Sequence, residues 1–213
     1  MNWDNDDPAV RWAKTERAVI GVTDEGTGQA VWKFYRIYLP VGVAVLLAAG
    51  CVVGLWIYGN DPDERVAQLG VGLSFAAMGA LVGSMVYSAK RVTPLVRPKH
   101  AGGLIWLEKP ERKALMDQIE GKKPTIPGQV PVLRGTAALV RKGLAPTLLM
   151  FPGFMLLYVS QLLTTFSDGW TWFQWLWCAL IPFMAALFVV TLRQFRRAGD
   201  FLARTGTAQE DSL

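Results

Sequence analysis

Four stretches without a charged side chain constrain this fold more than any other feature of the chain. They cover residues 37–58, 66–89, 147–166 and 172–192. An α-helix rises about 1.5 Å per residue, so each stretch can cross the roughly 30 Å hydrocarbon core of a bilayer. We therefore predict an all-α integral membrane protein with four transmembrane helices at these positions.

A basic segment, Lys90 to Lys142, separates the second apolar stretch from the third. It holds twelve Lys and Arg residues against four acids, a net charge of +8, whereas the whole chain carries +5. Its position predicts two transmembrane hairpins joined by a basic linker. The resulting divisions are an N-terminal tail (1–29), a first hairpin (30–89), the linker (90–145), a second hairpin (146–197) and a C-terminal tail (198–213).

The distribution of bases also predicts the orientation. The two short loops between paired helices contain one base, Arg65, whereas both tails and the linker are rich in bases. Lys and Arg accumulate on the cytoplasmic side of membrane proteins, so both termini and the linker are expected in the cytoplasm. The Ala-, Gly-, Trp- and Arg-rich composition suggests a bacterial plasma membrane. The same placement explains the basic pI without nucleic acid, which is not favoured as a partner.

The linker contains two amphipathic patterns. Pro110 begins the first helix and Gly121 follows its end, and the second is expected over 132–144. Basic amphipathic helices bind the anionic inner leaflet or a protein partner. The residues expected to face lipid or a partner are Trp106, Arg112, Lys113, Leu115, Met116, Ile119, Lys122 and Lys123.

Small residues recur at helical spacing in the first hairpin, where they allow close approach of helix backbones. We favour packing within the hairpin over a seam between two copies. The predicted packing residues are Gly50, Gly54, Gly72, Ala76, Gly79, Ala80, Gly83 and Ser84.

Three flanking regions give further expectations. Asp7-Pro8 suits the start of a short helix with Val10 and Ala13 on one face. The aromatic and basic stretch 30–38 is typical of a membrane–water boundary, as are the tryptophans from Trp170 to Trp177. The tail beyond Arg197 is polar and expected to be mobile.

The residue types needed for most chemistry are sparse. The single histidine is His100, the two cysteines lie in separate apolar stretches, and no Asp, Glu, Lys, Arg or His lies within a predicted span. Proton relays and ion-coupled carriers usually need such groups at depth. We predict no cofactor, no metal site and no catalytic activity.

Three functional hypotheses follow. The first is an accessory or scaffold subunit of a bacterial membrane complex, with a membrane partner or further copies of itself; it could also belong to a mobile-element or secretion system. The second is a small homo-oligomeric pore or carrier lined by Gln161, Thr164 and Thr165. The third is an enzyme acting on lipid through Lys99, His100 and Asp117, which nothing in the pattern brings together.

Overall fold

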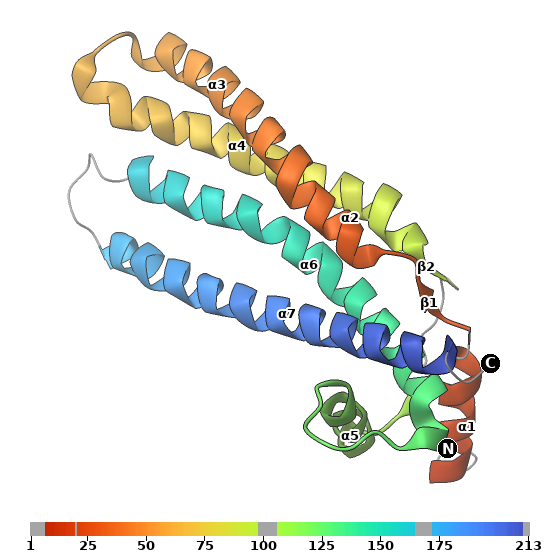
Figure 1. Cartoon of the computed structure of the whole chain (residues 1–213). Helices are drawn as coiled ribbons and strands as arrows, with labels where there is room; N and C mark the ends of the chain where they lie inside the picture. Colours follow the sequence, from red (N-terminus) through yellow and green to blue (C-terminus); the bar gives the residue numbers. More distant parts are fainter. Residues whose placement is uncertain (1–6, 20, 98–105, 165–171, 211–213) are drawn as a thin grey trace. The chain divides into compact units, whose positions relative to one another are not determined.

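The computed structural model describes residues 7–19, 21–97, 106–164 and 172–210 (Figure 1). The chain divides into two compact units. Unit 1 comprises Met1–Gly28, Arg91–Ala145 and Leu192–Leu213, and unit 2 comprises Gln29–Lys90 and Pro146–Thr191.

The described structure is helical apart from one short strand pair. The helices are α1 (Pro8–Val19), α2 (Thr27–Lys33), α3 (Leu39–Tyr58), α4 (Arg65–Tyr87), α5 (Lys109–Ile119), α6 (Val130–Thr164) and α7 (Trp172–Glu210). Strands β1 (Thr23–Asp24) and β2 (Val96–Arg97) pair antiparallel. Wider π-helical turns over Phe34–Tyr38 and Ser88–Val92 extend α3 at its start and α4 at its end.

Within the described residues, four helical segments are long and apolar enough to cross a membrane, as the sequence predicts. They are Thr27–Tyr58, Arg65–Leu95, Val130–Thr164 and Trp175–Gly206. On α3, Val41, Val45, Val52 and Trp56 share one face and are exposed, Trp56 to 88%. A continuous apolar face of this kind is stable in lipid but not in water.

Helix α6 corrects the predicted helix boundaries in the second half of the chain. The amphipathic pattern over 132–144 and the apolar stretch from 147 form one helix of 35 residues that contains Pro146 and Pro152. Each proline removes one backbone donor without ending the helix. Because prolines are tolerated in membrane helices, neither one is a reliable boundary here.

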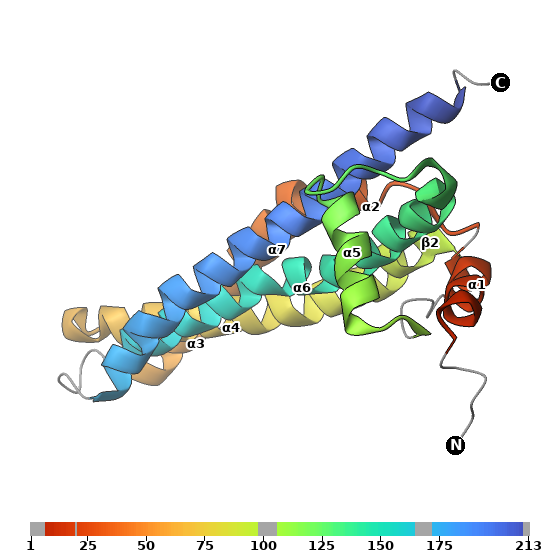
Figure 2. The same ribbon diagram turned by 90° about the horizontal axis from the view of Figure 1, so that it is seen from below.

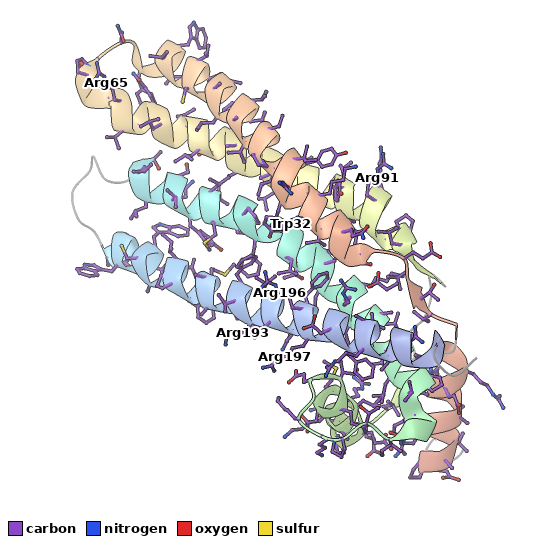
Figure 3. The ribbon with its side chains drawn as sticks, viewed as in Figure 1. Trp32, Arg65, Arg91, Arg193, Arg196 and Arg197 are labelled. Atoms are coloured by element: carbon purple, nitrogen blue, oxygen red, sulfur yellow. The ribbon has the colours of Figure 1, made fainter. Side chains whose placement is uncertain are left out.

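Helix α7 shows that the prediction of a mobile C-terminal tail was wrong. The helix continues past Arg193 and Arg197 to Glu210 (Figure 3). Ala198 and Phe201 lie in the hydrophobic core of unit 1, and this burial explains why the polar segment stays helical. The predicted turn over 167–170, with Trp170, lies outside the described residues.

Aromatic side chains pack within unit 2 where α2 meets α3. Phe34 is buried, and its ring centroid lies 5.1 Å from that of Tyr87. The hydroxyl groups of Tyr35 and Tyr87 donate to the backbone carbonyls of Leu148 and Ala30, at 2.5 and 2.9 Å. These rings, expected at a membrane boundary, therefore also join helices to one another.

The helices of unit 2 pack closely. α3 and α4 lie side by side along their length (Figure 1). α6 and α7 make ring contacts through Phe151 with Phe188, at 5.1 Å, and Tyr158 with Trp177, at 5.4 Å. From the first contact to the second, the residue number increases on α6 and decreases on α7. The two helices are therefore antiparallel.

Unit 1 has its own hydrophobic core. Helix α5 lies beside α6 and α7 (Figure 2). Its Leu115 and Ile119 pack in one cluster with Leu133 of α6 and Phe201 of α7. Three segments distant in sequence therefore form one core. The burial of these side chains shows that the basic linker has tertiary structure.

Helix α1 starts where predicted but buries a different face. Asp7 Oδ1 accepts a hydrogen bond from the Ala9 backbone N–H at 2.9 Å. The buried residues are Arg11, Thr15 and Val19, and not the predicted face of Val10 and Ala13. A side chain in place of Gly135 on α6 would overlap Val19, so this glycine lets α1 approach.

Candidate functional site

The most developed polar site lies in unit 1 and is organised around Asp24. Strand β1 holds this residue opposite Val96 of β2, and the Glu25 N–H adds a hydrogen bond to the Leu95 carbonyl at 3.0 Å. Asp24 Oδ1 accepts the backbone N–H of Thr27 at 2.8 Å, which caps the start of α2. Its other carboxylate oxygen is left to face α6.

Arg141 of α6 supplies the partner of that oxygen. Its Nη1 forms an ion pair with Asp24 Oδ2, and the side chains of Asp24 and Arg141 are only 3% and 14% exposed. The guanidinium carbon lies 4.6 Å from the centroid of the Phe195 ring on α7. A Cβ atom at Gly199 would lie 3.3 Å from the same carbon, so the glycine leaves room for the guanidinium.

A hollow of about 780 Å³ opens beside this ion pair. Its lining combines Asp24, Arg134 and Arg141 with apolar side chains that include Val22 and Leu202. Pockets of roughly 300–1,000 Å³ with a few fixed polar groups are typical of sites for small organic molecules. The volume of the hollow lies in that range, and its lining includes both charged and apolar side chains.

A second group of charges joins α1 to the start of α5. Arg11 is buried, and its Nη2 lies 3.2 Å from both Glu108 Oε1 and Glu111 Oε1. Glu108 and Glu111 form a capping box, in which Glu111 Oε2 accepts the Glu108 backbone N–H at 2.8 Å. That hydrogen bond, followed by the interactions with Arg11, lowers the pKa of Glu111 below its ordinary value.

The structure separates the predicted lipid- or partner-facing residues into two groups. Leu115 and Ile119 are buried in unit 1 and Met116 packs against them, so this chain's own helices cover the apolar face of α5. The others remain at the surface, and Trp106 lies beneath the Lys14 ammonium at 5.5 Å. These exposed residues are Trp106, Arg112, Lys113, Lys122 and Lys123.

Some of the surface bases have acidic neighbours. Lys122 Nζ lies 2.6 Å from a carboxylate oxygen of Glu120, and Lys123 Nζ lies 3.7 Å from Asp117. Glu120 also approaches Arg197 of α7 at 3.5 Å. Arg193, Arg196 and Arg197 follow one another along α7 (Figure 3). The surface of unit 1 thus carries a network of paired charges.

The predicted packing glycines of unit 2 lie mostly between α3 and α4. A Cβ at Gly50 would lie 2.8 Å from Gly72 Cα, and one at Gly54 would lie 3.0 Å from Gln68 Cα. A side chain at Gly79 would overlap Leu46, whereas Gly83 faces open space. Ala76, Ala80 and Ser84 are buried.

Polar side chains join α4 to α6 within unit 2. The hydroxyl groups of Ser74 and Ser160 lie 2.6 Å apart, and Ser160 donates to the Gly70 carbonyl at 2.7 Å. Thr164 Oγ1 lies 3.2 Å from the carbonyls of Ser160 and Gln161. The hydroxyls of Ser160 and Thr164 therefore contact helix backbones, and Thr165 lies outside the described residues.

Within the described parts of the chain, the remaining reactive groups do not assemble into a centre. Asp117 pairs with lysines, whereas Lys99 and His100 lie outside the described residues. Cys51 and Cys178 are free thiols. Over residues 7–19, 21–97, 106–164 and 172–210, no group of three His, Cys, Asp or Glu side chains could hold a metal ion.

Sequence reasoning did not find the groups centred on Asp24 and Arg11. Asp24 precedes Arg141 by 117 positions and Arg11 precedes Glu111 by 100, so no local spacing relates them. The only local signal was an Asp three residues before Thr27, which is an N-cap pattern.

Comparisons with known proteins give no relative for this chain. Neither the protein-family models, nor the curated proteins, nor the solved structures contain a match.

Proposed function

We propose that this chain is a multi-pass protein of the bacterial plasma membrane that acts as a non-catalytic accessory or scaffold subunit. In this proposal the four apolar helical segments form two hairpins in the bilayer. Unit 1 lies in the cytoplasm with both termini and binds a protein partner. The observation that carries the proposal is the folded core of unit 1, which gives the basic segment a defined surface.

The exposed side chains of unit 2 support insertion into lipid. Trp32 on α2 (Figure 3) and Trp56 on α3 are both exposed, and they lie near the two ends of one continuous helical segment. Their separation of 24 positions corresponds to about 36 Å of helix, close to the thickness of a bilayer between its interfaces. Tryptophan is enriched at those two interfaces.

The charges support a cytoplasmic unit 1. Arg65, at the start of α4, is the one base in the two loops that join paired helices, whereas the basic segment holds twelve (Figure 3). This asymmetry matches the distribution expected when the basic side faces the cytoplasm.

The use of ionisable groups in unit 1 supports a structural role. Arg11, Asp24, Glu111 and Arg141 are all engaged in ion pairs that hold its segments together. The exposed bases and Trp106 lie on the outside of this framework, where Lys122 and Lys123 have acidic neighbours. Tryptophan and arginine are common in partner-binding surfaces.

Site-specific photo-crosslinking in native membranes tests the partner. A photoreactive amino acid replaces Lys113 or Lys122 on the unit 1 surface, with Val45 on the exposed face of α3 as the lipid-facing control. We expect the two unit 1 positions to give the same protein adduct. Absence of an adduct at both, together with a monomer in several mild detergents, would contradict a scaffold role.

A topology assay tests the orientation separately. Reporters that are active on only one side of the membrane are inserted beside Lys113 and beside Asn60, in the turn between α3 and α4. We expect the Lys113 fusion to report cytoplasm and the Asn60 fusion to report the opposite side. The reverse pattern would refute the proposed orientation and leave the helical fold unaffected.

A further inference from the structure

We propose that the hollow in unit 1 is a binding site for an organic anion with a phosphate or carboxylate group on an apolar body. This inference goes beyond the scaffold role and does not depend on it. It rests on the guanidinium groups of Arg134 and Arg141 in the wall of the hollow and on the apolar lining beside them.

The hollow is lined by two arginines that can donate hydrogen bonds to an anion. Arg134 and Arg141 are seven positions apart on α6, which places them on one helix face about 10 Å apart along the axis. Among the described residues that line the hollow, Asp24 is the single acid. The described lining therefore combines two guanidinium groups with one carboxylate.

The side chain of Arg141 is held in a fixed position. Asp24, the Phe195 ring and Gly199 hold the guanidinium from different sides. Only Nη1 pairs with Asp24, and Nε is buried without an acceptor. A guanidinium has five N–H donors, so a second oxyanion can bind without displacing Asp24. A donor held in place before binding loses little conformational entropy when the ligand arrives.

The volume and the lining of the hollow favour one class of ligand. The volume of about 780 Å³ is far larger than a simple ion needs. Val22, Pro131, Leu202 and Ala203 add apolar surface beside the two arginines. Charge and apolar area together favour a molecule such as an aryl phosphate, a sugar phosphate with an apolar substituent or a phospholipid headgroup.

Binding of 1-naphthyl phosphate to the full chain in phosphatidylcholine nanodiscs tests the site. We expect saturable binding, with inorganic phosphate as a much weaker competitor. Arg134→Gln should weaken binding roughly tenfold or more, because a charge-assisted hydrogen bond is lost. Arg196→Gln on α7 removes the same charge from an exposed position outside the hollow and should leave the affinity unchanged.

A second variant separates binding from folding. Ala203 lines the hollow and is exposed, so Ala203→Phe should fill part of the volume without changing charge or core packing. We expect this variant to melt at the wild-type temperature and to bind at least tenfold more weakly. No saturable binding by the wild type, or wild-type affinity in both folded variants, would overturn the proposal.

Competition identifies the source of the anion. Nanodiscs that contain phosphatidic acid should abolish naphthyl phosphate binding if the natural ligand is a lipid headgroup. If the ligand is soluble, phosphatidic acid should have no effect and soluble phosphate monoesters should compete. Both results support an anion site and assign its source, whereas competition by neutral 1-naphthol equal to that of the phosphate would refute it.

Discussion

At the scale of single residues, two arginines determine how unit 1 is held together. Arg11 joins α1 to the capping box of α5, and Arg141 joins α6 to the strand that carries Asp24. Each guanidinium is largely buried and lies against carboxylates from a distant part of the sequence. Breaking such a pair leaves the other charge buried, so single substitutions here should have large effects.

Replacement of Asp24 by Asn tests the ion pair. The amide keeps an oxygen for the Thr27 N–H but loses the charge that Arg141 requires. We expect the free energy of unfolding to fall by about 3 kcal/mol. Denaturation in mild detergent, followed by tryptophan fluorescence, measures this change. Glu16→Gln removes the same charge from an exposed site on α1 and should have little effect.

The capping box makes the stability of unit 1 depend on pH. The pKa of Glu111 is lower in the folded protein than its ordinary value of 4.5, chiefly because of the Glu108 N–H. The unfolded chain therefore binds this proton more tightly, and protonation favours unfolding. The contribution of Glu111 is complete above pH 4.5 and is lost as the pH falls through the lowered pKa.

The variant Glu111→Gln isolates this contribution. We expect the difference in unfolding free energy between wild type and variant to be constant above pH 5 and to shrink as the solution becomes more acid. Urea titrations at a series of pH values measure it. A difference that stays constant down to the acid limit would contradict the assigned role.

At the scale of elements, the helices could be predicted far better than their ends. The absence of charge over 37–58 and 66–89 predicts the helices around α3 and α4. A segment that crosses a bilayer must satisfy its backbone hydrogen bonds internally, and an α-helix does so. The continuations of α6 and α7 could not be predicted in the same way. The amphipathic pattern over 132–144 predicted a helix around Leu133, but not its continuity with the apolar stretch that follows. The burial of Phe201 in unit 1 had no local sequence signal.

The candidate site could be predicted from the sequence even less well than the helix ends. The bases of the linker were identified, but their partners were not, because the pairing depends on a tertiary arrangement. The apolar face of α5 illustrates the same point. Its residues Leu115 and Ile119 were recognised as one face, but local pattern could not show that α6 and α7 cover it.

Two glycines of α3 give a matched test of helix packing. A methyl group at Gly50 would lie 2.8 Å from both Gly72 Cα and Phe75 Cβ, whereas one at Gly42 would meet nothing within 4 Å. We expect Gly50→Ala to lower the free energy of unfolding by about 1–3 kcal/mol through overpacking. Gly42→Ala should be neutral or stabilising by up to about 1 kcal/mol. Thermal unfolding in one detergent compares them, and equal stabilities would refute this contact.

At the scale of the whole molecule, unit 1 is assembled from three separate parts of the chain, with unit 2 supplied by the segments between them. The core that joins Leu115, Leu133 and Phe201 therefore depends on residues far apart in sequence. Contacts between residues far apart in sequence form late in folding. Closing the intervening chain lowers its entropy before the contacts stabilise the structure. During synthesis, Phe201 leaves the ribosome after all four apolar stretches have been translated. Until then, the apolar face of α5 lacks the part of its cover that α7 supplies.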